Sequence, residues 1–320
     1  MMRVGLIRNA ASYRNRTPDE AFRQTAMALL GDCFAEPSSP QELEAVLDRF
    51  VLRGVELLIV DGGDGTLHKV LGALPPQWVD TPPLFAILPS GNTNLVAADV
   101  GCTQRGTAGL GRLLEAVKNG GWRQYVKRRH ALDIEWADRS QVPQRGMFFG
   151  AAAFTRGIDI AHEGVHKQGL FQKLAVLVTI ALSGLQLLRR KSRDVWLSGE
   201  PMSVDIDMQG AREGDRFLFL ATSLQKMFFG IWPFWNGEAA ALRFLDVDAY
   251  PRDLLKAGVA VLRGRQPQWL QAHAHYHSGG AARIGLELSH RFIIDGEVFE
   301  PGPARRIILK AGPSLEFLVL

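Results

Sequence analysis

The sequence predicts an α/β N-terminal domain with a mainly parallel sheet, followed by a β-rich C-terminal domain built as an antiparallel sandwich. Three observations predict it. Strands and helices alternate up to about Lys118, two apolar strands end in glycine-rich turns, and short alternating runs dominate from Gly121 onward. We place the domains at 1–120 and 121–320, and the last strands could return to the first domain.

The elements of the first domain follow from hydrophobic periodicity and from turn residues. Short apolar runs indicate buried strands, and apolar residues at helical spacing indicate helices on the faces of the sheet. The predicted strands are Arg3–Ile7, Leu57–Val60 and Leu84–Pro89. The predicted helices cover Asp19–Leu30, a segment from Pro40 that ends at Gly54, a segment from Thr66 to Leu74, and Leu110–Lys118.

The second domain is predicted from short runs that alternate or are rich in β-branched and aromatic residues. They are HALDIEW, GMFFGAAAF, MSVDIDM, DRFLFLATSL, ALRFLDV, ARIGLEL, HRFIID, RRIILK and LEFLVL. Two helices interrupt them, at Leu170–Arg190 and Pro251–Arg263. We expect separate strands for the last two runs.

Composition narrows the class of protein. The chain has 320 residues, is 47% hydrophobic and 22% charged, and carries a net charge of +4, which is typical of a folded, mildly basic protein. It contains no zinc-finger spacing or RNA-binding motif, so a nucleic-acid partner is not expected. The two cysteines, Cys33 and Cys102, indicate a reducing compartment, and we expect a cytoplasmic protein.

The first glycine-rich turn follows the strand Leu57–Val60 and reads Asp61-Gly62-Gly63-Asp64-Gly65-Thr66. Glycines that lead into a helix N-terminus offer free N–H groups and a positive dipole end, which favour phosphate. An aspartate there would repel phosphate unless a cation such as Mg²⁺ lay between them. The alternative interpretation is a tight strand-to-helix turn with Asp64 as a structural cap.

Two further turns carry polar groups. After Pro89, the second turn supplies Gly91, Asn92, Thr93 and Asn94, which could bind phosphate or ribose or could cap the next helix. The third turn, Asp295-Gly296-Glu297, is typical of a type I′ hairpin. One of its carboxylates could also accept the proton of an attacking hydroxyl.

Together, GGDGTL, LPSGNTN and IIDGEVFEPG resemble the diacylglycerol kinase catalytic family, which includes bacterial lipid kinases and sphingosine and ceramide kinases. GGDGT is shared with NAD kinases, and the late Asp-Gly-Glu turn favours the lipid-kinase branch. The resemblance implies an ATP- and Mg²⁺-dependent kinase with a nucleotide cleft between its two domains and a lipid hydroxyl as acceptor.

The resemblance also assigns roles to residues. It implies Asp64 as a metal-binding and catalytic residue and Asp295 or Glu297 as the general base. The nucleotide and its phosphates would be bound by Asn9, Gly62, Gly63, Asp64, Gly65, Thr66, Gly91, Asn92 and Asn94.

The sequence also departs from the family pattern. The second turn lacks the usual acid after its asparagine, His68-Lys69 replaces the common Asn-Glu, and WNGEAAALRF lacks an Asp-Gly pair. Three hypotheses therefore remain. The first is a lipid kinase acting on diacylglycerol or on a sphingoid or ceramide lipid. The second is a kinase of a soluble acceptor. The third is a non-catalytic nucleotide- or lipid-binding relative.

Some features bear on the acceptor and on membranes. The aromatic segment Ser223–Trp235 is predicted to be mostly core, with an acyl groove or bilayer contact as the alternative. The basic run Arg189–Arg193 could attract the inner face of a membrane, giving peripheral contact. His273, His275 and His277 would share one face of a strand, and a metal site there is the less favoured interpretation. The sequence leaves the oligomeric state open.

Overall fold

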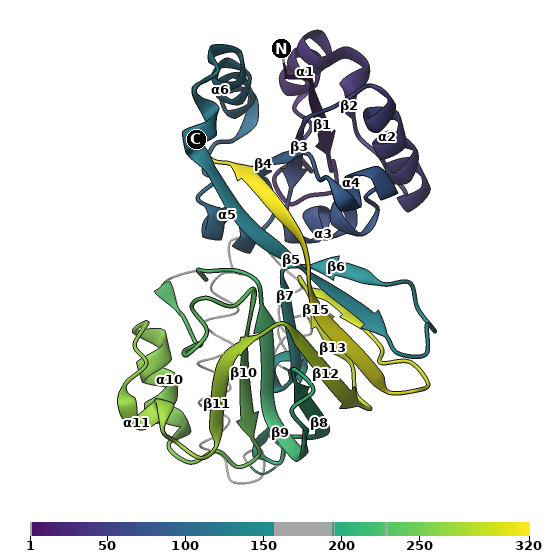
Figure 1. Cartoon of the computed structure of the whole chain (residues 1–320). Coiled ribbons are helices and arrows are strands. Elements are labelled where there is room, and N and C mark those ends of the chain that lie inside the picture. The colour runs from purple at the N-terminus through teal and green to yellow at the C-terminus, as the bar shows by residue number, and fades with distance from the viewer. Residues whose placement is uncertain (1, 157–193, 195, 228–229) are drawn as a thin grey trace. The chain divides into compact units, whose positions relative to one another are not determined.

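The computed structural model describes residues 2–156, 194, 196–227 and 230–320 of the chain (Figure 1). It divides into two compact units. Unit 1 comprises Met1–Ala131 together with Pro313–Leu320, and unit 2 comprises Leu132–Gly312. The chain passes between the units along two strands, β5 (Val126–Trp136) and β15 (Arg306–Leu318).

Unit 1 is built on a parallel sheet. Its strands are β1 (Val4–Arg8), β2 (Phe34–Ala35), β3 (Leu57–Gly62) and β4 (Leu84–Pro89). They lie in the order β2-β1-β3-β4, and the end of β15 adds a further parallel strand through Phe317, opposite Phe85. Every residue of β1, β3 and β4 is buried, which explains why these strands read as continuous apolar runs in the sequence.

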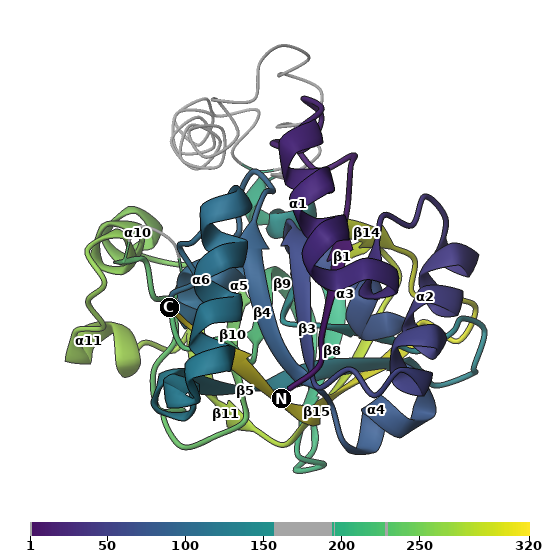
Figure 2. The same cartoon turned by 90° about the horizontal axis from the view of Figure 1, so that it is seen from above.

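Helices cover both faces of this sheet. They are α1 (Glu20–Leu30), α2 (Pro40–Leu52), α3 (Asp64–Gly72), α4 (Pro76–Asp80), α5 (Leu95–Val100) and α6 (Gly106–Asn119). Figure 2 shows α1 and α6 side by side over the strands, where Phe22 and Leu110 join one hydrophobic cluster with Leu6. On the other face, the Phe50 ring of α2 lies where a Cβ of Gly5 would be, so a glycine is required there.

The topology brings three loops to one edge of the sheet. The loop after β1, the turn from β3 into α3 and the turn from β4 into α5 all follow the carboxyl ends of parallel strands. This edge is where open α/β sheets bind their ligands.

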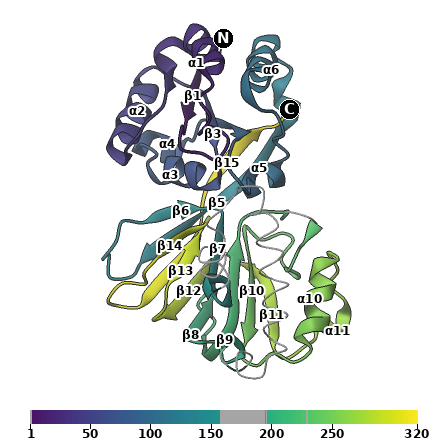
Figure 3. The same cartoon turned by 180° about the vertical axis from the view of Figure 1, so that it is seen from behind.

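Unit 2 consists of antiparallel strands. They are the second half of β5, β6 (Gln144–Gly146), β7 (Phe148–Ala152), β8 (Glu200–Ile206), β9 (Ala211–Thr222), β10 (Leu242–Asp248), β11 (Tyr276–Ala281), β12 (Arg283–Leu288), β13 (Phe292–Ile294), β14 (Glu297–Phe299) and the first half of β15. Alternate residues of these strands form one buried cluster that includes Trp136, Phe149, Phe219 and Phe292. Two helices, α10 (Leu254–Leu262) and α11 (Gln268–Gln271), lie beside β11 (Figure 3).

The predicted fold class is confirmed: an α/β unit with a parallel sheet is followed by a region rich in antiparallel strands. One prediction about the strands was wrong. RRIILK and LEFLVL form a single strand, β15, that continues through Pro313. Proline lacks an N–H, and Pro313 lies between Lys310, the last residue paired with β12, and Phe317, which pairs with β4. No ladder hydrogen bond of these two pairings needs its nitrogen.

The predicted histidine stripe was also wrong. His277 lies on β11, whereas His273 and His275 lie in the turn that precedes the strand, with their rings 5.6 Å apart. The strand begins only at Tyr276, because the short helix α11 ends at Gln271 and a turn must follow it. The predicted helix Leu170–Arg190 and the basic run Arg189–Arg193 both lie outside the described residues.

A buried ion pair fixes α5 within unit 1. Arg129 of β5 donates to both carboxylate oxygens of Asp99, at 2.6 and 3.2 Å. The side chains are 6% and 0% exposed, so the two charges are removed from water and depend on each other. This pair anchors the helix that follows the second glycine-rich turn.

We expect Asp99→Asn to lower the free energy of unfolding by about 3–5 kcal/mol, because it leaves the Arg129 charge buried without a counter-charge. The matched control is Asp32→Asn, which breaks an exposed ion pair with Arg53 and should cost at most about 1 kcal/mol. Urea unfolding monitored by circular dichroism measures both. Equal losses in the two variants would contradict this role of Asp99.

Candidate active site

Backbone hydrogen bonds join the three loops at the carboxyl edge of the unit 1 sheet. Asn9 N–H donates to the Asp61 carbonyl, Ser90 N–H to the Gly62 carbonyl, and Arg14 N–H to the Ser90 carbonyl, each at 2.9 Å. The loop after β1 and the two glycine-rich turns therefore form one connected structure.

The glycines are required because the turns lie against each other and against α3. A Cβ on Gly63 would lie 2.8 Å from the Gly91 Cα, and a Cβ on Gly91 would lie even closer to the Gly63 Cα. A Cβ on Gly62 would lie 2.5 Å from the Thr66 side chain. Real Cβ atoms do not approach other heavy atoms this closely, so backbone-to-backbone packing of the two turns explains the glycines directly.

Asp64, the acid between the glycines, holds the second turn in place. Its two carboxylate oxygens accept hydrogen bonds from the Leu95 and Val96 N–H groups, at 2.9 and 3.0 Å. These are the first amides of α5, so a residue at the start of α3 caps a neighbouring helix. The negative charge also lies at the positive end of that helix dipole. Sequence reasoning had weighed Asp64 as a cap, but not as the cap of α5.

Thr66 connects the first turn to the loop after β1. Its hydroxyl oxygen accepts from the Asn9 side-chain amide at 2.8 Å and lies 3.3 Å from the Ser12 hydroxyl. The Asn9 side-chain oxygen, Oδ1, accepts a hydrogen bond from the Ala11 N–H. Asn9 and Thr66, which the sequence assigned to nucleotide binding, thus lie in direct contact.

The two asparagines of the second turn differ in how their side chains are used. Asn94 has a left-handed backbone, with φ of 53°, and its side-chain amide both accepts from the Gly91 N–H and donates to the Gly91 carbonyl. It therefore closes the turn. Asn92, by contrast, has a buried Oδ1 with no hydrogen-bond partner among the described residues. Such an atom normally has a partner, so Asn92 is suited to accept from a ligand or a bound water.

A buried acid, Asp61, lies at the end of β3 and was not assigned a role from the sequence. It accepts from the Ser90 hydroxyl and from the Asn15 side chain, and lies 3.3 Å from the Arg8 guanidinium. Burial raises the pKa of Asp61 above its ordinary value, against the opposing effects of these partners. Its position within an apolar strand followed by glycine was the available signal in the sequence.

Positive charge also gathers in unit 1. Arg14 belongs to the loop that bonds Ser90, and Arg105 is the residue that precedes α6. Burial lowers the pKa of Arg105, and the nearby positive charge of Arg14 lowers it further. Two neighbouring guanidinium groups are suited to an anionic ligand, and sequence reasoning missed both because they lie 91 positions apart.

The third predicted turn belongs to unit 2. Asp295 and Gly296 both have positive φ, at 48° and 92°, and Ile294 pairs with Glu297, as a type I′ hairpin requires. The Asp295 carboxylate accepts from the Met147 and Phe148 N–H groups, with the shortest distance 2.9 Å. The Glu297 side chain is exposed on β14. The hairpin therefore uses Asp295 to hold itself against β7, and it presents Glu297 to solvent.

The described residues contain no cluster of three or more histidine, cysteine or acidic side chains that could hold a metal ion. Mg²⁺ needs fewer protein ligands when it arrives with a nucleotide, because phosphates and waters complete its shell. Asp64 and Asn92 offer oxygens beside the first turn, which fits an ion carried by a nucleotide better than one held by the protein alone.

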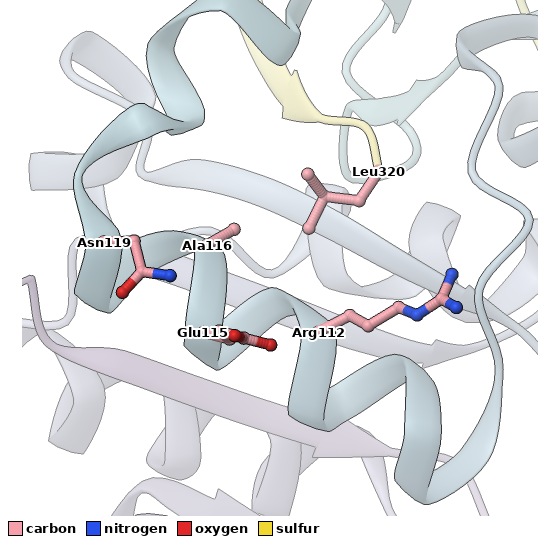
Figure 4. A pocket seen from close by; sticks show the side chains of 5 residues that line it. All are labelled: Arg112, Glu115, Ala116, Asn119 and Leu320. Carbon is pink, nitrogen blue, oxygen red and sulfur yellow. The ribbon is translucent and has the colours of Figure 1, made fainter.

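Other features lie away from these turns. A shallow hollow of about 270 Å³ is lined by residues of α6 and by Leu320 (Figure 4). None of the predicted nucleotide-binding residues lines it. In the aromatic segment of unit 2, Ile231, Phe234 and Trp235 are buried. These side chains belong to the core, as the sequence favoured.

Part of the chain matches a known protein family. Residues 4–124, which contain all three loops of unit 1, match the diacylglycerol kinase catalytic domain. The resemblance stated from GGDGTL and LPSGNTN is confirmed for this part of the chain. The family consists of phosphotransferases, and ATP is their phosphate donor.

Solved structures share the fold of this chain over nearly its whole length. A protein from Bacillus anthracis str. Sterne provisionally named a diacylglycerol kinase has a TM-score of 0.63 at 17% identity, covering 99% of this chain and 97% of its own. A diacylglycerol kinase structure from the same organism has a TM-score of 0.58 at 15% identity with the same coverage. No curated protein sequence matches the chain.

We expect Gly91→Ala to lower the free energy of unfolding by about 1–3 kcal/mol and to weaken nucleotide binding, because the new methyl group separates the two turns. Urea unfolding and calorimetric titration with ATP measure the two effects.

The matched control is Gly72→Ala at the end of α3, where an added Cβ meets no atom within 4 Å. This variant should keep nucleotide binding and should gain up to about 1 kcal/mol of stability from helix propensity. Nucleotide binding by Gly91→Ala at the wild-type level would contradict the requirement for contact between the turns.

Proposed function

We propose that the chain is a lipid kinase that transfers the γ-phosphate of ATP to a hydroxyl group of a lipid such as diacylglycerol. The observation that carries the proposal is the direct packing of the two glycine-rich turns at the carboxyl edge of the unit 1 sheet. That packing supports a phosphate site, because it places glycine backbone and the start of α3 where a ligand of such sheets binds.

In this proposal, the nucleotide phosphates bind the first turn through Gly62, Gly63, Gly65 and Thr66. The second turn contributes Gly91, Asn92 and Asn94, with the unpartnered Asn92 Oδ1 as an acceptor for the nucleotide or a water. Asn9 orients Thr66 through their hydrogen bond. Arg14 and Arg105 add positive charge that favours the anionic ligand.

A bound Mg²⁺ would neutralise charge on the phosphates during transfer. Asp64 and Asn92 are the residues we propose to assist in holding it. Asp64 already uses both oxygens on α5, so we propose that it acts mainly by holding the second turn in position and contacts the ion only through the remaining lone pairs or a water.

We propose Glu297 as the general base and Asp295 as its positioning residue. A base must direct an oxygen at the proton that it removes. The Asp295 carboxylate accepts hydrogen bonds from two backbone amides of β7 and its preceding residue, whereas the Glu297 side chain is exposed. Glu297 would take the proton of the acceptor hydroxyl as the oxygen attacks the γ-phosphate and ADP departs.

The acceptor and the location of the protein are also proposals. Diacylglycerol is the proposed acceptor, with sphingoid and ceramide lipids as competitors and a soluble acceptor such as NAD as the second hypothesis. No helix among the described residues has the length and apolar character needed to cross a bilayer. We propose a cytoplasmic protein that contacts the inner face of the membrane peripherally.

We expect wild-type protein to transfer labelled γ-phosphate from Mg·ATP to diacylglycerol in mixed micelles, and Glu297→Gln to lose at least about 100-fold in kcat with little change in ATP affinity. Asp295→Asn should lose activity together with stability, because it disturbs the hairpin. Thin-layer separation of labelled lipids measures transfer, and urea unfolding measures stability.

Two results would redirect the proposal. Label in NAD but not in lipid would establish the soluble-acceptor kinase. ATP binding without label in a panel of diacylglycerol, sphingosine, ceramide and NAD would establish the non-catalytic relative.

We expect Asp64→Asn to lower the free energy of unfolding by about 1–2 kcal/mol, because an amide can accept from only one of the two α5 amides at its oxygen and presents a donor to the other. Titration of ATP with and without Mg²⁺ separates the roles of Asp64. If Asp64 acts mainly on the turn, both affinities fall together. If it acts mainly on the ion, only the Mg²⁺-dependent part falls.

A further inference from the structure

Helix α10 of unit 2 exposes an apolar face. Leu255, Val259 and Leu262 are 63%, 46% and 42% exposed, and their spacing of four and then three residues places them within an arc of about 60° on the helix. Ala257, on the opposite side, is buried and attaches the helix to the unit. We call Leu255, Val259 and Leu262 the α10 face.

This face needs an explanation because its exposed apolar residues lie together on one side of the helix. A surface helix normally turns its apolar stripe inward and its polar residues outward. Here the stripe faces outward while the small Ala257 faces inward. A contiguous exposed apolar stripe marks a surface that contacts a partner or a membrane.

Basic residues lie along one side of the α10 face and at both ends of the helix. Lys256 and Arg263 are exposed and lie about 40 to 60° further around the same helix, on one side of the stripe. Arg252 before the helix and Arg265 after it are exposed too. Asp253, the acid at the start of the helix, lies 3.7 Å from the His273 ring.

An aromatic side chain adjoins this surface. The Lys256 ammonium lies 4.1 Å from the ring centroid of Trp269 in α11, and α11 and α10 lie beside each other in two perpendicular views (Figures 1 and 2). Tryptophan favours the boundary between hydrocarbon and water, and lysine can bury its stem while its charge reaches lipid headgroups. The composition is that of a helix that lies in a membrane interface.

We propose that the α10 face is a docking surface for an anionic lipid bilayer, with Leu255, Val259 and Leu262 in the acyl region and Lys256 and Arg263 on the headgroups. Charge complementarity selects this occupant over a second copy of the chain, because two copies would bring the same basic residues together. The α10 face would provide the proposed peripheral membrane contact. Its biological purpose, access to a lipid acceptor, rests on the proposed function.

The sequence had suggested other segments for membrane contact. In the aromatic segment, Ile231, Phe234 and Trp235 are buried, and Phe228 and Phe229 lie outside the described residues. The α10 face was not identified from sequence, because its periodicity predicts a helix but not which side faces the solvent.

The test is sedimentation of the full chain with vesicles, in the absence of ATP. We expect wild type to bind phosphatidylcholine vesicles that contain phosphatidylglycerol and to bind pure phosphatidylcholine weakly. A triple variant, Leu255→Gln with Val259→Gln and Leu262→Gln, should bind the anionic vesicles at least about tenfold more weakly. A double variant, Lys256→Gln with Arg263→Gln, should lose about fivefold for each charge removed, and less at high salt.

The matched control removes three exposed apolar side chains elsewhere: Met27→Gln, Leu29→Gln and Leu52→Gln, which are 59%, 56% and 88% exposed on α1 and α2. It should bind like wild type. Circular dichroism checks that every variant is folded. In addition, Trp269→Phe should remove part of the vesicle-induced blue shift of tryptophan fluorescence.

Three results would overturn the proposal. One is equal vesicle binding by wild type and the α10 triple variant, and another is equal binding to neutral and anionic vesicles. The third is self-association that the triple variant loses, without vesicle binding, which would assign the face to a second copy. Phosphate transfer to diacylglycerol in detergent micelles is measured separately, so a failure of the kinase proposal is distinguished from a failure of docking.

Discussion

The contact between the two glycine-rich turns is the constraint on which the rest of unit 1 depends. Gly63 and Gly91 touch through their backbones, and the Asp64 carboxylate then spans from the start of α3 to the first amides of α5. Each interaction needs the other, because the carboxylate reaches α5 only if the turns are close. The parallel registers of β1, β3 and β4 set this spacing, and the buried Arg129–Asp99 pair holds α5 from its other end.

This arrangement explains why an acid can lie in a turn suited to phosphate. The Asp64 carboxylate accepts hydrogen bonds from two amides at the positive end of the α5 dipole. These interactions offset part of its repulsion toward an anion even without a cation. In unit 2, Asp295 follows the same principle, since its carboxylate accepts hydrogen bonds from the backbone amides of Met147 and Phe148. Both aspartates thus support a neighbouring segment.

How much the sequence could predict depended on the range of the interactions. The strands Leu57–Val60 and Leu84–Pro89, the helix after Asp64 and the hairpin at Asp295 follow from local periodicity and turn chemistry, and all four are present. The hydrogen bonds from the Leu95 and Val96 amides to Asp64 could not be predicted, because these residues lie about thirty positions from Asp64 and no local pattern pairs them. The histidine stripe failed because a turn precedes β11, and β15 was divided because Pro313 ordinarily interrupts a strand. The side of α10 that faces solvent depends on packing, which periodicity alone does not specify.

The return of the last residues to unit 1 bears on how the protein is made. Phe317 pairs beside β4 and Leu318 enters the same hydrophobic cluster as Leu6 and Leu110, although all of unit 2 is encoded before them. During synthesis on the ribosome, one edge of β4 therefore stays unpaired until β15 has emerged. An unpaired apolar edge invites pairing with another chain. A fragment limited to residues 4–124 would keep that edge permanently, so it should be a poor substitute for the whole protein in the laboratory and prone to aggregate.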